Sequence, residues 1–148
     1  MKDIPVWKVQ KCDGAEYLMA LLQFLLAEYS RVFGTDIMTA EECIVYNDPE
    51  SECPRIIFNT VPIRIRLHQK SLSFWAQTIF QLSHEMCHYA MYQAKEDKEQ
   101  TLSWFEEIVC EAMSLYALEM LQKTGINVPY IELIRTFAII FRIIWIMN

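Results

Sequence analysis

The segment His84-Glu85-Met86-Cys87-His88 decides what this chain can be, because it follows the pattern HExxH. In a helix, residues four apart lie one above the other on the same face, so His84 and His88 can present two imidazoles to one metal ion. Glu85 lies about a quarter-turn away, where its carboxylate can reach a water on the metal rather than the metal itself. The pattern therefore indicates metal-assisted hydrolysis, in which the metal lowers the pKa of the water and the glutamate takes its proton.

The sequence around the motif predicts one long helix. Residues 72–93 contain neither glycine nor proline, and apolar residues recur there at helical spacing. These residues are Trp75, Ile79, Leu82, Met86 and Met91. Ser71 or Ser73 can cap the start of the helix. Because HExxH also occurs by chance, this helical context is what makes a metal site the favoured interpretation.

The third metal ligand must come from elsewhere, since a catalytic zinc ion usually takes three protein ligands and leaves a fourth position open. No histidine follows His88, and the next helix offers Glu106, Glu107, Cys110 and Glu111. We favour Glu107, because the 18 residues between it and His88 suffice for a turn and the start of an antiparallel helix. Glu111 is one turn later on the same face, where it could accept the N–H of a ligating imidazole. His68 is a less favoured third ligand.

With these residues the chain resembles the gluzincins, the HExxH metallopeptidases whose third ligand is a glutamate on the following helix. Their pattern places a small residue three positions after that glutamate and an acidic or amide residue four positions after it, as Cys110 and Glu111 stand here. The chain is most similar to minimal gluzincins such as the ImmA/IrrE-type peptidases, over residues 72–121. Two features depart from the family. Glu111 stands where Asp or Asn is usual, and no residue is an evident counterpart of the downstream His or Tyr that larger gluzincins use on the oxyanion. The tyrosines considered for that role are Tyr89, Tyr92, Tyr116 and Tyr130.

At 148 residues the chain is most simply one domain, spanning residues 1–148, and the resemblance implies a zincin-like α+β fold for it. This fold is a small mixed or antiparallel sheet of three to four short strands, packed on an N-terminal helix, the HExxH helix, the glutamate helix and a C-terminal apolar helix. It also implies a zinc peptidase of gluzincin type, with Zn²⁺ held by His84, His88 and Glu107. Glu85 is then the general base, and Glu111 supports a ligating imidazole.

Two other interpretations stay open. In the first, a gluzincin-like domain keeps zinc but binds a peptide or protein without cleaving it, and Cys110 is the nearby candidate to close such a site. An intact Glu85 disfavours it, because a structural zinc site needs no general base. In the second, the motif is an accident on the core helix of an α-rich domain.

The remaining elements follow from apolar periodicity and turn residues. A helix is predicted over residues 15–33, with Asp13 as its N-cap and Gly34 after its end. Strands are predicted at 4–11, 43–47, 55–60 and 63–68. The glutamate helix is predicted at 104–123, with Ser103 and Glu106 as a capping box.

The strand before the motif helix alternates strictly, with Arg64, Arg66 and His68 on its polar face. Pro62 at its start suits an edge strand. In peptidases of the resembled type, this strand forms the upper rim of the cleft, and the peptide substrate pairs with its edge. The resemblance makes Arg64, Arg66 and His68 candidates to face substrate, although for each one a solvated polar face is the simpler interpretation.

Composition limits the partners. The net charge of −6 and the pI of about 5.0 argue against a nucleic-acid partner. The five cysteines form no CxxC pair and the first residues lack an apolar leader, so we expect a cytoplasmic protein with reduced thiols. Residues 130–147 are very apolar, but Glu132, Arg135 and Arg142 interrupt them, so we expect a packing helix and no membrane association. The exposed apolar surplus of that helix is a candidate homodimer or partner interface.

Overall fold

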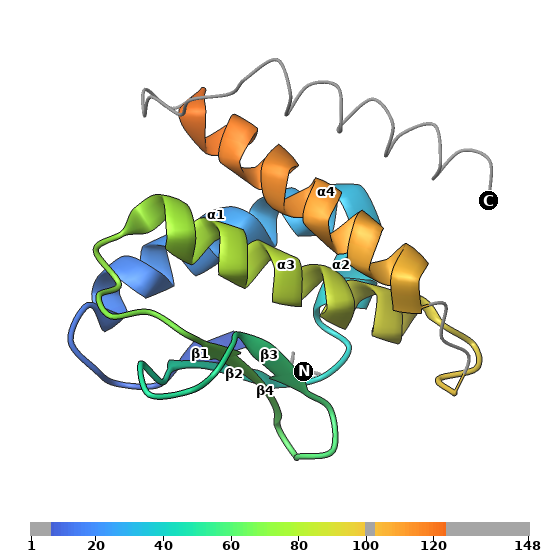
Figure 1. The fold of residues 1–148 in the computed structure, drawn as a ribbon. Coiled ribbons are helices and arrows are strands. Elements are labelled where there is room, and N and C mark those ends of the chain that lie inside the picture. The colour runs from blue at the N-terminus through green and yellow to red at the C-terminus, as the bar shows by residue number, and fades with distance from the viewer. Residues whose placement is uncertain (1–6, 100–102, 124–148) are drawn as a thin grey trace, which may run out of the picture.

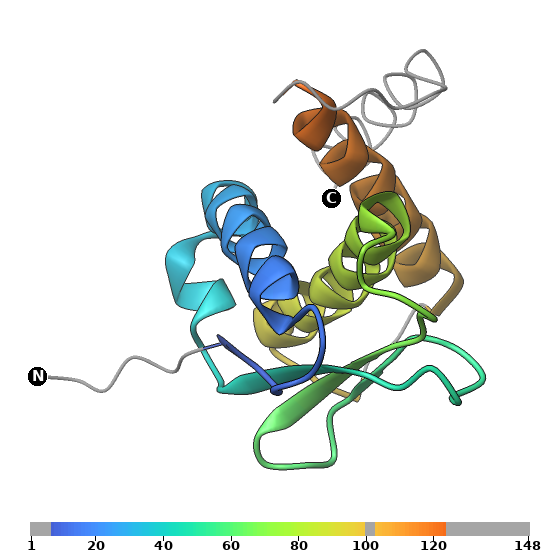
Figure 2. The ribbon, with the colours of Figure 1, turned by 90° about the vertical axis from the view of Figure 1, so that its left-hand side faces the viewer.

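The computed structural model describes residues 7–99 and 103–123, which form a four-stranded sheet with helices on one of its faces (Figures 1 and 2). In chain order the elements are β1 (Trp7–Val9), α1 (Ala15–Phe33), α2 (Thr35–Met38), β2 (Cys43–Asn47), β3 (Arg55–Ile57), β4 (Ile63–Leu67), α3 (Trp75–Ala94) and α4 (Ser103–Gln122). The expected α+β class and the mixed sheet of short strands are confirmed. The expected C-terminal helix lies outside the described residues.

The sheet has the strand order β1-β2-β4-β3, in which β1, β2 and β4 are parallel and β3 is antiparallel to β4. The expectation that the strand at 63–68 is an edge strand is wrong, because β4 pairs with β2 on one side and with β3 on the other. Pro62 is compatible with this central position, since pairing with β2 begins one residue later, at Ile63, and the proline removes no hydrogen bond from the ladder. Among the described strands, β3 forms the edge next to β4.

The core lies between the sheet and the helices α1 and α3, and it extends to the buried face of α4. The alternation predicted for β4 is confirmed, because Ile63, Ile65 and Leu67 are buried and Arg64 is exposed. The core residues of the helices include Leu18, Leu22 and Leu25 of α1 and Ile79, Leu82 and Met86 of α3. Helix α4 runs back across α3 on the side away from the sheet, as Figure 1 shows. The motif helix is thus covered by sheet, α1 and α4 together.

The bounds of α1 match the prediction, but its N-cap does not. Gly14, with φ of 83°, occupies the cap position, and no side chain caps the helix. A Cβ atom on Gly14 would lie 3.2 Å from Cβ of Leu72, so the glycine also permits a close approach to the segment before α3. Gly34 ends α1 as expected, and its N–H donates to the carbonyl of Ser30.

Helix α3 begins without a side-chain cap as well. Phe74 occupies its N-cap, while the hydroxyls of Ser71 and Ser73 lie 2.7 Å apart and bond to each other. In α4 the carboxylate of Glu106 contacts the ammonium of Lys95, at the end of α3, and thereby links the two helices. The short helix α2 was not predicted.

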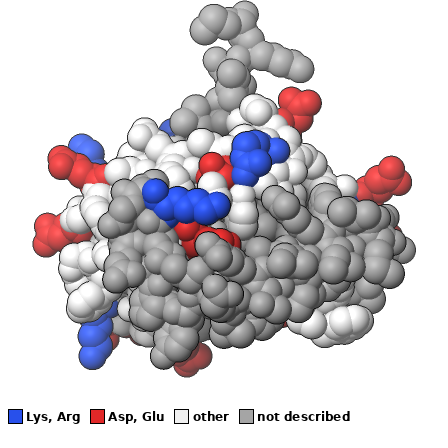
Figure 3. All heavy atoms as spheres, turned by 90° about the horizontal axis from the view of Figure 1, so that it is seen from above, with Lys and Arg blue, Asp and Glu red and all other residues white. Residues whose placement is uncertain are grey.

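Three further findings bear on the expectations from composition. All five cysteines are free. None of the helices in the described ranges is both long and apolar enough to cross a membrane. On the face seen in Figure 3, the described Lys and Arg side chains lie among acidic ones and form no basic patch.

A hydrogen bond between α1 and α3 gives the first test. The buried hydroxyl of Tyr29 donates to the carbonyl of Ser83, the residue before His84, at 2.5 Å. We expect Tyr29→Phe to lower the free energy of unfolding by about 1 kcal/mol, the usual net worth of one such bond. Tyr17→Phe, at a site 38% exposed, should change it by less than about 0.5 kcal/mol. Urea unfolding followed by circular dichroism measures both; equal stabilities would contradict the prediction.

Candidate metal centre

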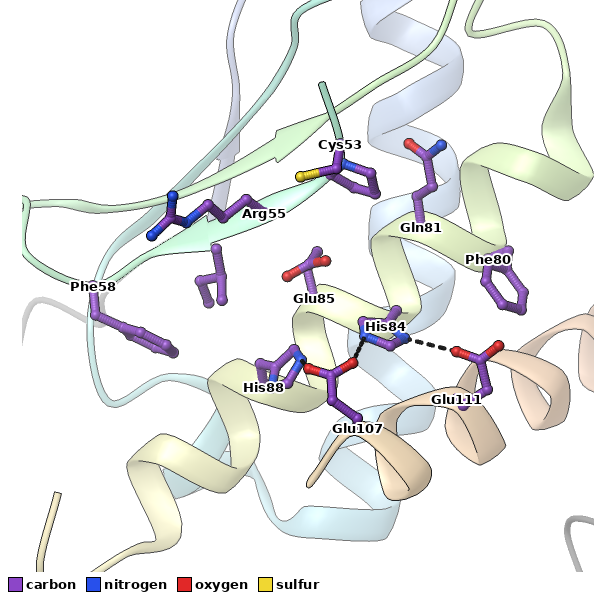
Figure 4. A pocket seen from close by; sticks show the side chains of 12 residues that line it. Cys53, Arg55, Phe58, Phe80, Gln81, His84, Glu85, His88, Glu107 and Glu111 are labelled. Atoms are coloured by element: carbon purple, nitrogen blue, oxygen red, sulfur yellow. Dashed lines mark hydrogen bonds and ion pairs between the residues drawn. The ribbon is translucent and has the colours of Figure 1, made fainter. Parts of the chain in front are cut away.

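A pocket of about 500 Å³ opens between α3, α4 and the segment that runs into and out of β3 (Figure 4). Its lining residues are Cys53, Pro54, Arg55, Ile56, Phe58, Phe80, Gln81, His84, Glu85, His88, Glu107 and Glu111. The pocket thus contains the three favoured metal ligands His84, His88 and Glu107, together with Glu85 and Glu111.

Glu107 lies between the two motif histidines. Its Oε2 atom is 3.1 Å from Nε2 of His84, and its Oε1 atom is 2.9 Å from Nε2 of His88. The two imidazole rings come from successive turns of α3 with their centroids 5.1 Å apart. Figure 4 shows all three side chains converging from α3 and α4. The structure therefore brings together the three ligands that the sequence favoured.

The Nδ1 atom of each imidazole faces a different carboxylate. Oε2 of Glu111 is 3.4 Å from Nδ1 of His84, as expected for a residue that supports a ligating imidazole. Oε2 of Glu106 is 4.0 Å from Nδ1 of His88, and the same carboxylate contacts Lys95. The sequence did not predict the Lys95–Glu106 pair, because only the crossing of α4 over the end of α3 brings the two residues together. With both Nδ1 atoms facing carboxylates, the Nε2 atoms are the ones directed to a common point beside Glu107.

Cys110 is a second candidate for the third ligand. Donor atoms of His84, His88 and Cys110 all lie within 4.8 Å of one another. However, Cys110 is fully buried and does not line the pocket, whereas Glu107 does. A hydrogen bond with Cys87, together with burial, raises the pKa of the Cys110 thiol, and the thiolate is the form that binds metal. Glu107 therefore suits a site open to substrate better than Cys110 does.

The electrostatics of the histidines favour metal binding at one position more than at the other. Burial and the neighbouring His88 lower the pKa of His84, which keeps its imidazole neutral and able to bind a metal. Burial also lowers the pKa of His88, but the hydrogen bond with Cys110 and the charges of Glu107 and Glu106 outweigh it. The net pKa of His88 is raised in the metal-free chain. A metal ion therefore competes with a proton more strongly for the imidazole of His88 than for that of His84.

Glu85 has the environment of a general base. Its side chain is 5% exposed, and burial followed by the charge of Glu107 raises its pKa to about 7. A backbone hydrogen bond from Ile56 and the charge of Arg66 act in the opposite direction without cancelling the rise. A carboxyl group that titrates near neutral pH can both take and return a proton under working conditions.

The residues predicted to face substrate lie elsewhere. Arg64, Arg66 and His68 are absent from the pocket lining; Arg66 donates to the carbonyl of Cys53 at 3.2 Å. The Nδ1 atom of His68 lies 3.4 Å from the hydroxyl of Ser51. His68 does not belong to the group of close donor atoms formed by His84, His88 and Cys110, so nothing favours it as a third ligand. Instead, Arg55 and Ile56 of the edge strand β3 line the pocket. The polar face of β4 could not reveal this, because which strand borders the pocket depends on the pairing of β3 with β4.

The tyrosines considered for oxyanion contact are engaged elsewhere in the described part of the chain. The hydroxyl of Tyr89 donates to the carbonyl of Glu41 at 2.7 Å. The hydroxyl of Tyr116 accepts from Arg31 at 2.7 Å, and the ring of Tyr92 stacks on Phe58. None of these three lines the pocket, and Tyr130 lies outside the described residues.

Comparison of the chain with models of protein families, with curated proteins and with solved structures found no match. The case for a metal centre rests on the residues and distances given above.

The raised pKa of Glu85 predicts a pH dependence of stability in the metal-free protein. The native state keeps this proton up to about pH 7, whereas the unfolded chain loses it near the ordinary value of 4.5. Because the native state binds more protons between these values, the contribution of Glu85 to the free energy of unfolding falls as the pH rises through that window. Glu85→Gln cannot ionise, so its stability relative to the wild type should grow from pH 4.5 to pH 7, by on the order of 3 kcal/mol.

Urea unfolding in the presence of a chelator, at several pH values, measures this difference directly. The control is Glu50→Gln, which changes an exposed loop residue and should follow the wild type throughout. A difference between Glu85→Gln and the wild type that stays constant with pH would contradict the assignment of the raised pKa to Glu85.

Proposed function

We propose that this chain is a zinc-dependent peptidase, in which His84, His88 and Glu107 hold the zinc ion and Glu85 is the general base. The observation that carries the proposal is the Glu107 carboxylate, which lies 3.1 Å and 2.9 Å from the Nε2 atoms of both motif histidines. Two imidazoles and one carboxylate are a donor set that catalytic zinc sites use, with a fourth position left for water or substrate. The residues present therefore fit the metal.

Bound zinc would supply a Lewis acid that polarises the peptide carbonyl and lowers the pKa of water towards neutrality. Glu85 takes a proton from the attacking water while the oxygen of that water adds to the carbonyl carbon. Glu85 then returns that proton to the amide nitrogen as the C–N bond breaks, which a pKa of about 7 permits at neutral pH. Glu111 holds the ring of His84 through Nδ1, so that Nε2 keeps its direction during the reaction.

The edge strand β3 supports a peptide as the substrate. Arg55 and Ile56 line the pocket, and β3 has a strand partner on one side only in the described sheet. An extended peptide can add to such an edge through main-chain hydrogen bonds. This keeps the binding mode that the gluzincin resemblance implies but assigns it to β3 rather than to the strand at 63–68.

One observation favours a second candidate, a zinc-binding domain that holds a peptide or protein without cleaving it. The Cys110 thiol is close enough to His84 and His88 to join the same metal ion, and a fourth protein ligand would close the site. The burial of Glu85 in the same pocket favours the peptidase, since a closed site has no use for a general base.

Metal analysis of variants separates the two ligand sets. After exposure to zinc and dialysis, we expect about one zinc per chain in the wild type and in Cys110→Ala, and little in His84→Ala or Glu107→Ala. Glu111→Ala should retain the site with an affinity weaker by about 10- to 100-fold. Loss of zinc in Cys110→Ala as well as in Glu107→Ala would favour the closed, four-ligand site. Loss in Glu111→Ala but not in Glu107→Ala would reverse the roles of the two glutamates, and no zinc in the wild type would exclude both candidates.

Glu85→Gln tests the catalytic step itself. The change removes the base while keeping the size of the side chain, so zinc should stay bound and peptide hydrolysis should fall by about 10²- to 10⁴-fold. Cleavage of a peptide mixture, followed by mass spectrometry and by zinc content, measures both quantities. Glu50→Gln, in the exposed loop after β2, should match the wild type in both. Undiminished hydrolysis in Glu85→Gln would exclude the proposed mechanism.

A further inference from the structure

We propose that the pocket selects peptides with large apolar side chains on both sides of the cleaved bond, one in contact with Phe58 and the other in contact with Phe80. The inference rests on the proposed peptidase function and deepens it by naming the substrate class. It comes from the two ends of the pocket, which the metal-binding residues do not use.

Phe80 forms one end of the pocket. It precedes His84 by four residues on α3, so both side chains lie on the same face of the helix. The ring packs against the core on one side, is only partly buried, and lines the pocket with the rest of its surface. In Figure 4 it lies on the side of His84 that is away from His88.

Phe58 forms the other end. It follows β3 directly and stacks on Tyr92 of α3, with ring centroids 4.2 Å apart and planes inclined by 22°. This stacking fixes the orientation of the ring, and its remaining surface lines the pocket. Figure 4 shows Phe58 beyond His88, on the opposite side from Phe80.

The charged groups lie between these two ends. Figure 4 places His84, Glu85 and His88 in the region between the two phenylalanines, so a carbonyl carbon positioned for attack would have one aromatic ring on either side. Successive side chains of an extended peptide point in opposite directions, which suits two separate apolar contacts. Pro54 and Ile56 add apolar surface along the same wall, and about 500 Å³ is enough for the side chains next to the bond.

The test uses a series of fluorogenic peptides that differ only at the two residues flanking the cleaved bond, which mass spectrometry identifies. The zinc-loaded wild type should cleave the peptide with Leu at both positions about tenfold faster, in kcat/KM, than a peptide with Ala at either one. Asp at either position should lower the rate further. Because this series needs no variant protein, it decides the question even where a variant does not fold.

Variants then assign each position to one ring. Phe58→Ala should lose the preference for Leu over Ala at one of the two positions, and Phe80→Ala should lose it at the other. Phe74→Ala removes an exposed phenylalanine that lies outside the pocket, and it should keep both preferences. Equal cleavage of the Leu, Ala and Asp peptides by the wild type would overturn the inference and leave the peptidase function standing.

A binding measurement separates this inference from the proposed function. The affinity of the same labelled peptides for zinc-loaded Glu85→Gln, measured by fluorescence anisotropy, should follow the same order without any cleavage. One outcome is that the wild type cleaves no peptide while the order of affinities holds and depends on Phe58 and Phe80. That result would reject the proposed peptidase function and keep the inferred preference for peptides with large apolar side chains. If the affinity is the same whichever residues flank the bond, the inferred preference for apolar side chains is wrong, whether or not the wild type cleaves peptides.

Discussion

The site depends on the packing of α4 across α3. Both helices contribute buried apolar side chains to the core, α3 through Met86 and Ala90 and α4 through Val109 and Met113. This packing fixes the distance between the two helices, and with it the distance from a side chain on one helix to a side chain on the other. A glutamate on the adjoining turn of α4 can therefore reach two imidazoles on successive turns of α3. In this arrangement Glu107 lies 3.1 Å and 2.9 Å from the two Nε2 atoms, and the Lys95–Glu106 ion pair joins the same two helices.

The same packing concentrates negative charge in one pocket. Glu85, Glu107 and Glu111 all line it, and burial deprives Glu85 of the water that would stabilise its charge. The nearby cations compensate only in part, since Arg66 lowers the pKa of Glu85 but leaves it well above the ordinary value. A divalent cation beside the imidazoles would offset the repulsion between Glu107 and Glu85. The zinc ion of the proposed function would therefore offset part of the energetic cost of the metal-free arrangement.

Local sequence patterns predicted some elements with the correct bounds and others only roughly. Helix α1 and strand β2 have the predicted bounds, because a wide apolar face and a short β-rich run are properties of neighbouring residues. The edge of the sheet was predicted wrongly, because strand order depends on pairing between residues far apart in the chain. The same reason explains why Arg64 was considered a substrate contact while Arg55, on the strand that borders the pocket, was not.

The grouping of residues in the candidate site was easier to predict than the strand order, because these residues repeat at helical spacing. His84 and His88 are one turn apart, as are Glu107 and Glu111, so the face that each pair shares could be inferred without knowing how the helices pack. What the spacing could not decide was the partner of each ring nitrogen. The structure places Oε2 of Glu111 3.4 Å from Nδ1 of His84 and Oε2 of Glu106 4.0 Å from Nδ1 of His88.

Whether Cys110 joins Glu107 as a ligand decides between a closed and an open site. The two residues are three apart on α4, so both can approach the imidazoles, but they do so from different sides. Cys110 approaches from the buried contact between α3 and α4, where no substrate can follow. Glu107 approaches from the pocket, where Glu85 also lies and where β3 presents an edge. A metal ion held by Glu107 would therefore stand in the same space as the base and the substrate, which is the arrangement that hydrolysis needs.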